Sequence, residues 1–270
     1  MNSEIHTLVS DMLERLSHER LIDAGVIGWA SPVISFGNFS TSPIATLGLN
    51  PSNKEFVDNN GNELEKMNRR FPTLRSLGIH SWTQIEQQHI EIILDANKNY
   101  FSRNPYDTWF KSLDNIISGT TYSYYKPLFE ACHLDLVPYT TFQKWGELSG
   151  KDREFLLSEC ESFIGRLLQA SEISLLVLNG KSVVNSLASI SNVNFSTARQ
   201  KSWTLGRKSG EDIKGYSYTG IISKVGSVNL DREIKVLGFN HNIQSSFGVT
   251  RKVRSSIQNW VLDQTLEFSV

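Results

Sequence analysis

Four short runs of apolar residues are spaced along the chain, at residues 44–49, 132–137, 173–178 and 234–239. Each run has the length of a strand that is buried on both faces, and each is followed by turn residues, such as Asn50-Pro51-Ser52 after the first. Segments with helical periodicity lie between the runs. Strands that alternate with helices predict an α/β fold, with three α/β/α layers and a mainly parallel central sheet.

Three segments show the spacing of an amphipathic helix. The first covers residues 8–16, the clearest covers residues 155–168, and the last carries Val253, Ile257 and Val261 on one face. Residues 203–231 differ, because spaced glycines alternate there with Tyr, Ile and Val, which predicts a hairpin or an insertion. We therefore expect a single domain over residues 1–270, with an N-terminal helical segment over residues 1–40.

The composition limits the classes of partner and cofactor. With 270 residues, 39% of them hydrophobic, the chain is long enough to form one large core, and its formal net charge of -1 excludes a polycation. Any contact with nucleic acid must therefore come from a local basic face. The two cysteines, Cys132 and Cys160, are too few for a four-thiolate site, so we expect no metal and no other cofactor.

The hydropathy pattern has no feature of a membrane or secreted protein. The first residues lack an apolar signal core, and no apolar run approaches the length of a membrane span. We therefore predict a cytoplasmic protein that makes no membrane contact, and we expect a monomer.

A polar residue ends or follows each of the four apolar runs. Asn50 follows the first run, Asp135 lies near the end of the second, Asn179 follows the third and His241 follows the fourth. Ligands of parallel sheets bind beyond the carboxyl ends of the strands. We therefore expect these four residues to gather around one crevice.

Two of these turns resemble motifs of a known enzyme family. Gly48-Leu49-Asn50-Pro51 is similar to the first motif of the uracil-DNA glycosylase superfamily, in the Asn form that is typical of its mismatch-specific and single-strand-selective branches. His241 matches the His that opens the second motif, although the family's following Pro-Ser is replaced here by Asn242-Ile243. The turn Asn179-Gly180-Lys181 also looks like a strand-to-helix turn of the family.

The resemblance implies the hydrolysis of an N-glycosidic bond in DNA, with Asn50 and His241 as catalytic residues. That reaction places positive charge on the sugar and negative charge on the departing base. Asn50 would hold the attacking water through its side-chain carbonyl, and His241 would donate a hydrogen bond to the pyrimidine O2. A neutral imidazole suffices for that role because it still carries one N–H donor.

Asp135 and Ser52 bear on which base is cut. Asp135 falls where the family has an Asn that binds the edge of the flipped base, and an ionised Asp only accepts hydrogen bonds, which suits the 4-amino group of cytosine. Ser52 stands where uracil-specific relatives carry a Tyr that blocks the pyrimidine C5 position. The pair predicts a C5-modified cytosine as substrate. The alternatives are a structural role for Asp135, as a helix cap or ion-pair partner, and a simple helix cap for Ser52.

Further residues are candidates for contact with DNA. Phe56, Phe71 and Tyr106 are candidates for stacking on the flipped base, and the sequence does not choose among them. The segment from Asn242 to Phe247 is expected to enter the DNA, with a wedge residue among Ile243, Gln244 and Phe247. The expected phosphate contacts, for which a solvated surface is the alternative, are Lys181, Arg207, Lys208 and Arg251.

The sequence thus predicts a monofunctional DNA glycosylase that flips out a modified base and leaves an abasic site. Modified cytosines occur in phage genomes, so defence against phage DNA is one biological role that fits. Repair of uracil or other deaminated bases is the second hypothesis. A non-catalytic DNA-binding module on the same fold is the third.

Overall fold

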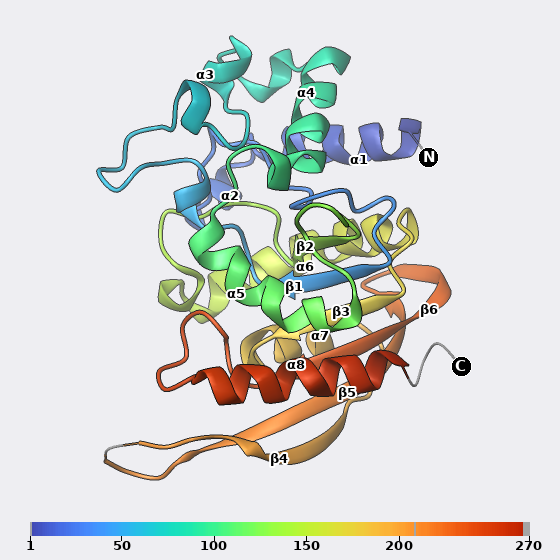
Figure 1. Cartoon of the computed structure of the whole chain (residues 1–270). Coiled ribbons are helices and arrows are strands. Elements are labelled where there is room, and N and C mark those ends of the chain that lie inside the picture. The colour runs from blue at the N-terminus through green and yellow to red at the C-terminus, as the bar shows by residue number, and fades with distance from the viewer. Residues whose placement is uncertain (1, 208, 267–270) are drawn as a thin grey trace.

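One six-stranded sheet forms the centre of the protein (Figure 1). The computed structural model describes residues 2–207 and 209–266. The strands are β1 (Ile44–Gly48), β2 (Ala131–Asp135), β3 (Leu175–Asn179), β4 (Ser196–Leu205), β5 (Ile213–Val225) and β6 (Val228–Phe239). Their order across the sheet is β2-β1-β3-β6-β5-β4.

The sheet is mostly parallel, as the alternating pattern predicts. β1 pairs in parallel with β2 and with β3, and β3 pairs in parallel with β6. β5 and β4 then extend the sheet by antiparallel pairing beyond β6. Every residue of β1, β2 and β3 is buried, because helices or loops cover both faces of this half of the sheet.

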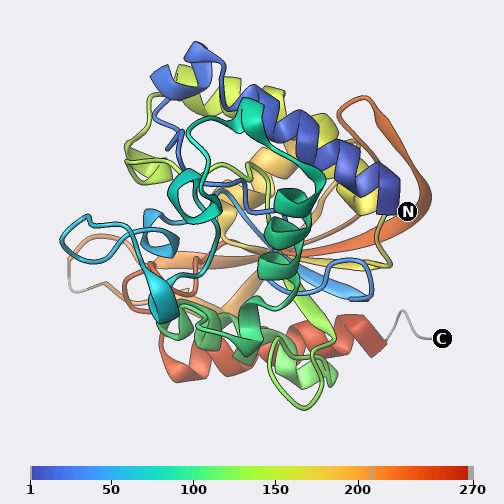
Figure 2. The same cartoon turned by 90° about the horizontal axis from the view of Figure 1, so that it is seen from above.

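Helices surround the sheet. They are α1 (Asn2–Arg15), α2 (Glu19–Asp23), α3 (Leu74–Leu77), α4 (Gln87–Lys98), α5 (Asp107–Ile117), α6 (Gly150–Gln169), α7 (Lys181–Ile190) and α8 (Arg251–Leu266). α6 and α7 contact the strands on one face and α1 packs on α6, while α8 contacts β4 and β6 on the other face and packs on α5. The view from above in Figure 2 shows the sheet between these two layers.

Residues 203–231 form hairpins, although they are no separate insertion. β4 begins at Ser196, seven residues before the predicted start, and β5 and β6 are joined by a tight turn in which Gly226 has a φ of 55°. The first half of β6 belongs to this ribbon and its second half pairs with β3. The segment is therefore continuous with the central sheet.

The N-terminal segment over residues 1–40 is helical only as far as Asp23. Gly25 follows with a φ of 86°, which ends the helix, and Pro32 disfavours another helix start before it. The chain then runs extended, and Phe36 bridges to His133 of β2. The expected helical segment thus becomes, in its second half, a strap along the edge of the sheet.

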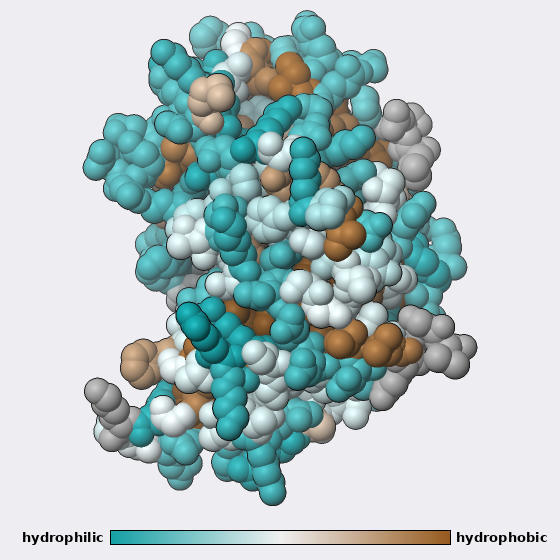
Figure 3. All heavy atoms as spheres, viewed as in Figure 1, coloured by the Kyte–Doolittle hydropathy of each residue, from teal (hydrophilic) through white to brown (hydrophobic). Residues whose placement is uncertain are grey.

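The surface that Figure 3 displays is mostly hydrophilic, and its apolar residues lie in small separate groups. Among the helices that residues 2–207 and 209–266 form, none combines the length and the apolar character needed to cross a bilayer.

Candidate active site

A cleft of about 960 Å³ lies beyond the carboxyl ends of the parallel strands. Its floor is formed by strand-end residues, among them Asn50, Asp135 and Asn179. Residues that follow β2, from Lys144 to Leu157, contribute the opposite wall. The expected crevice is therefore present, because three neighbouring parallel strands end at one edge of the sheet.

A smaller pocket of about 70 Å³ adjoins the cleft and shares Asn50, Trp109 and Asp135 with it. A buried water needs about 10–15 Å³, so the pocket has room for roughly five waters or a small planar ring. The residues that line it are Phe36, Asn50, Pro51, Ser52, Glu55, Tyr106, Trp109, Phe110, His133 and Asp135.

His241 does not join the other strand-end residues. Its side chain is 2% exposed and lines neither cavity, although its neighbours Asn240 and Asn242 line the cleft. The ring Nε2 lies 2.7 Å from the backbone carbonyl oxygen of Trp203, to which it donates a hydrogen bond. Burial lowers the pKa of His241, so the ring is neutral near pH 7. The His241 ring is therefore not oriented to make the expected hydrogen bond to a bound base.

Asn50 is held in one orientation by Thr141. The Thr141 hydroxyl donates to the carbonyl oxygen of Gln143 at 2.6 Å, so its oxygen must accept from Asn50 Nδ2, 2.9 Å away. This fixes the amide nitrogen toward the protein. The Asn50 Oδ1 atom has no hydrogen-bond partner in the part of the chain that the structure describes. Asn50 therefore presents an acceptor where the two cavities meet.

A chain of hydrogen bonds aims His133 at Asp135. Tyr124 is buried, and Thr46 Oγ1 is the one hydrogen-bond partner of its hydroxyl in the described ranges, so the phenol donates its proton to Thr46 Oγ1. The Thr46 hydroxyl then donates to His133 Nδ1 at 2.7 Å. This leaves the ring proton on His133 Nε2, which lies 3.4 Å from Asp135 Oδ1.

Asp135 has a structural contact and a free acceptor at the same time. No helix begins at Asp135, and its one ion-pair contact among residues 2–207 and 209–266 is with His133. The Asp135 side chain is 4% exposed, and the residue lines both cavities. The second carboxyl oxygen is therefore available to accept a hydrogen bond inside the small pocket.

Gly48 makes room for this carboxylate. It pairs with Asp135 across β1 and β2, and a Cβ atom on Gly48 would overlap Asp135 Oδ1 and lie 3.0 Å from His133 Nε2. We expect Gly48→Ala to displace the carboxylate and to lower stability by about 1–3 kcal/mol through overpacking. Base release, the activity predicted from the sequence, should fall with it.

Urea unfolding and single-turnover cleavage would measure the two effects of Gly48→Ala. Gly146→Ala is the matched control, because Gly146 lines the same cleft and a Cβ there meets nothing within 4 Å. Equal behaviour of the two variants would show that Asp135 does not need the space beside Gly48.

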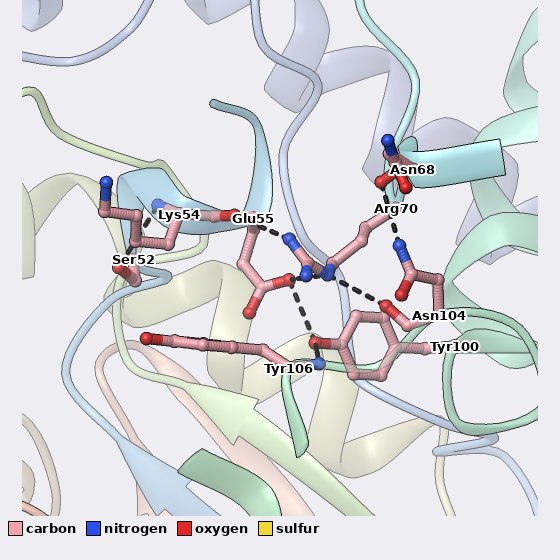
Figure 4. Close-up of polar contacts among 8 residues, drawn as sticks. All are labelled: Ser52, Lys54, Glu55, Asn68, Arg70, Tyr100, Asn104 and Tyr106. Atoms are coloured by element: carbon pink, nitrogen blue, oxygen red, sulfur yellow. Dashed lines mark hydrogen bonds and ion pairs between the residues drawn. The ribbon is translucent and has the colours of Figure 1, made fainter. Parts of the chain in front are cut away.

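Glu55 is a buried acid in the small pocket. It ends the short helix η1 (Asn53–Glu55), which Ser52 caps by accepting a hydrogen bond from the Lys54 amide, and its side chain is 2% exposed. Tyr100 donates to Glu55 Oε2 at 2.9 Å, and Arg70 Nε lies 3.7 Å from the same oxygen. Figure 4 shows both groups converging on that oxygen, while the other points away from Arg70.

The environment of Glu55 favours its neutral form. Burial is the main cause that raises the pKa of this carboxyl to about 7; Arg70 and the hydrogen bond from Tyr100 act to lower it, and the nearby Asp135 acts to raise it. Near neutral pH the pocket therefore contains a carboxyl group that carries a proton about half of the time.

The aromatic residues that line the pocket differ in part from those expected. Phe56 and Phe71 are each 1% exposed and pack against one another behind the pocket, with Phe71 stacked on Tyr100. Neither lines either cavity, because both fill the core between the strap and the sheet. Tyr106 and Trp109 are half-buried and line the small pocket. Phe36 and Phe110 also line this pocket but are buried, so Tyr106 and Trp109 are its more exposed rings.

The segment after His241 is fixed by Asn179. The Asn179 side chain accepts from the Ile243 amide at 3.0 Å and donates to Gln244 Oε1 at 2.7 Å. Gln244 in turn donates to the Trp109 carbonyl oxygen, and Ile243 is 1% exposed in the core. Of the three expected wedge residues, only Phe247 projects outward, with 81% of its surface exposed.

The predicted phosphate contacts lie at the same edge of the molecule. Lys181 is exposed at the start of α7 and lines the cleft, and Arg251 is exposed at the start of α8. Arg207 is exposed in the turn between β4 and β5, which Figures 1 and 2 both place at the edge where the parallel strands end. Lys208 lies outside the described residues.

Three residues of the site were missing from the expectations: Glu55, Thr141 and His133. An acid after a turn and a Thr after an apolar run are ordinary surface residues by pattern, so the sequence carries no signal of their burial. His133 was visible, because it precedes Asp135 by two residues and both side chains of a strand at that spacing point to one face.

Within residues 2–207 and 209–266, no three or more His, Cys, Asp or Glu side chains are grouped so as to hold a metal ion. The sequence matches none of the protein-family models and none of the curated proteins with which it was compared.

Proposed function

We propose that the protein is a monofunctional DNA glycosylase, which hydrolyses the N-glycosidic bond of a flipped, C5-modified cytosine and leaves an abasic site. The observation that carries this proposal is the small pocket beside Asn50, which combines aromatic rings with the carboxyl groups of Glu55 and Asp135. It opens into a cleft of about 960 Å³ at the carboxyl edge of the parallel strands. Such a pocket suits a single base that has left the DNA stack, and the cleft has room for the strand that carries it.

Asn50 orients the attacking water. Its free Oδ1 accepts a hydrogen bond from a water placed below the anomeric carbon of the flipped nucleotide, where the positive charge of the sugar develops. An amide is a weak base, so Asn50 contributes by orientation rather than by removing a proton before the bond breaks. The hydrogen bonds of Thr141 hold the amide in the orientation that this role requires.

Asp135 and Ser52 support the choice of base. The free oxygen of Asp135 accepts from the 4-amino group of cytosine, a group that uracil lacks. Ser52 is exposed and lines the pocket, so a small side chain there leaves space for a substituent. Ordinary cytosine shares the same edge, so it must be rejected through contacts with the C5 substituent itself. Residues 57–65, which Figures 1 and 2 place at this edge, are candidates for those contacts.

The charges around the cleft suit a DNA backbone. Lys144, Arg153 and Lys181 line it, against two acidic side chains, Asp135 and Glu154. Basic side chains of this kind bind phosphates without base preference, and they orient the strand relative to the pocket. The bulk charge of the chain contributes little, so this local excess is what would attract DNA.

Phe247 is the proposed wedge. Extruding a base leaves a gap in the stack, and an exposed ring that fills the gap offsets part of an unstacking cost of a few kcal/mol. We expect Phe247→Ala to slow base release from duplex DNA by about tenfold or more, with little change on single strands. Single-turnover rates on matched duplex and single-stranded oligonucleotides would measure this. Phe142→Ala, at another exposed ring, is the control; equal losses on both substrates would remove the wedge.

The function itself is tested with oligonucleotides that carry one cytosine, 5-hydroxymethylcytosine, glucosylated 5-hydroxymethylcytosine or uracil. We expect alkali-labile sites only at the C5-modified cytosines, and a shift toward uracil in Asp135→Asn, because the amide supplies both donor and acceptor. Glu154→Gln is the control from the opposite wall. Cleavage at uracil alone by the wild type would support a repair enzyme instead. DNA binding without any cleavage would support a non-catalytic module.

A further inference from the structure

Two carboxyl groups from separate elements face the same small pocket. Asp135 comes from the end of β2, and Glu55 comes from η1, which follows Asn50 and Pro51. Each is at least nine-tenths buried, and each has one oxygen bound by protein groups and one without a partner in the described ranges. Two buried acids beside one ligand pocket are a common arrangement for moving a proton.

The hydrogen bonds of Glu55 decide where its proton lies. The amide of Tyr106 donates to the Tyr100 hydroxyl oxygen at 2.8 Å, and the Tyr100 hydroxyl donates to Glu55 Oε2 at 2.9 Å. Arg70 Nε, a donor, is 3.7 Å from the same oxygen. Because Oε2 receives these donors, the proton of the neutral acid lies on Oε1. The pocket then presents a donor from Glu55 and an acceptor from Asp135.

We propose that Glu55 is the acid of the reaction, donating its Oε1 proton to ring N3 of a 4-aminopyrimidine whose amino group is bound by Asp135. This inference rests on the proposed glycosylase function and names the group that neutralises the departing base. The bond between N1 and C1′ breaks and its electron pair stays with the base, which takes the proton from Glu55 at N3. Water adds its oxygen to C1′ and loses a proton, which solvent returns to the Glu55 carboxylate.

The chemistry of the base explains why an acid is needed there. Uracil leaves as an anion whose charge spreads over two carbonyl groups, whereas a 4-aminopyrimidine has only one. A cytosine-type base therefore gains more from protonation as it leaves. The ring N3 of cytosine is an acceptor, while that of uracil carries a hydrogen, so the protonated Glu55 also contributes to the selection of base. His241 donates to the Trp203 carbonyl oxygen, so it is not placed to neutralise the departing base.

The surroundings of Glu55 set the pH range in which it acts. The charged and titratable groups that face it are Arg70, Tyr100 and Tyr106 on one side, and His133 and Asp135 across the pocket. The pKa of Glu55 lies at about 7, raised chiefly by burial. Below that pH the acid is ready to donate, and above it the carboxylate repels the electron pair of N3. Base release should therefore be fast in mild acid and should fall in mild alkali.

The test compares single-turnover release of 5-hydroxymethylcytosine from an oligonucleotide between pH 5.5 and 9. For the wild type we expect a plateau below about pH 7 and a fall of about tenfold for each pH unit above it. Glu55→Gln should be about a hundredfold slower at pH 6 and nearly independent of pH, with half-saturation unchanged, because its amide still donates to N3. Glu55→Ala should weaken half-saturation as well.

The control is Glu91→Gln, at an exposed acid of α4 that lines neither the small pocket nor the cleft, and it should keep the wild-type profile. If the wild type cleaves and Glu55→Gln retains both its rate and its pH profile, the role of Glu55 is overturned. The proposed glycosylase function would still stand. A wild type that cleaves uracil better than modified cytosine would overturn the assigned base edge. A wild type that cleaves no probe would overturn the glycosylase, and the acid with it.

Discussion

Replacing Asn50 by alanine is expected to lower the rate of base release by about two to three orders of magnitude, which is the usual cost of removing one well-placed polar group from an active site. The substitution removes the Oδ1 acceptor that would hold the attacking water. It also leaves Thr141 Oγ1 without its donor, 2.9 Å away. Single-turnover release from a modified oligonucleotide, with the urea midpoint as a check on folding, is the measurement.

Two further variants serve as comparisons for Asn50→Ala. Asn185→Ala, at an exposed asparagine of the same cleft, should release the base at the wild-type rate. His241→Ala should also keep that rate and should lose about 1–3 kcal/mol of stability, because the Trp203 carbonyl oxygen loses its buried donor. An equal loss of rate at His241 would show that this side chain turns into the site when DNA binds.

The stability of the protein is expected to fall as the pH rises past neutrality, and Glu55 is the reason. Its pKa rises from an ordinary value of 4.5 to about 7 on folding, so in this window the folded state holds a proton that the unfolded chain releases. Stability from such a group is complete below pH 4.5 and is lost as the pH passes about 7. At about 1.4 kcal/mol for each pH unit, the whole effect is roughly 3 kcal/mol.

Glu55→Gln removes this dependence, because a glutamine does not ionise. The free energy of unfolding of the wild type should fall between pH 5 and pH 8.5 by about 2–3 kcal/mol more than that of the variant. Urea unfolding of the wild type and of the variant, each at pH 5 and pH 8.5, gives the four free energies of unfolding. The titration of all other groups cancels when the two proteins are compared. Parallel pH dependences would show that Glu55 is ionised in the folded protein near neutrality.

The sheet follows directly from the pattern of the chain. The four apolar runs predicted at residues 44–49, 132–137, 173–178 and 234–239 become β1, β2, β3 and the end of β6, all parallel. A run that is apolar at every position needs cover on both faces, which a parallel sheet between helix layers provides. Helix periodicity likewise located α1, α6 and α8, although α1 begins six residues and α6 five residues before the predicted segments.

The ribbon of β4 and β5 was recognised as a hairpin but not as part of this sheet. Its register is set by long-range pairing with β6, and β4 is exposed at most positions, so no local apolar pattern marks its start at Ser196. The strap from residue 24 onward is also irregular, and single bridges to distant residues hold it in place. The local spacing of apolar residues does not predict such long-range contacts.

The sequence by itself determined which residues end the strands, and so it brought Asn50, Asp135 and Asn179 to one cleft. Only the tertiary structure decided where each side chain points. It turned His241 toward a backbone carbonyl, placed Phe56 and Phe71 behind the pocket, and buried Glu55 beside Asp135. The physical reason is that strand ends are fixed by local pattern, whereas the direction and protonation of a side chain depend on partners far away in the chain, as Tyr100 and Arg70 are for Glu55.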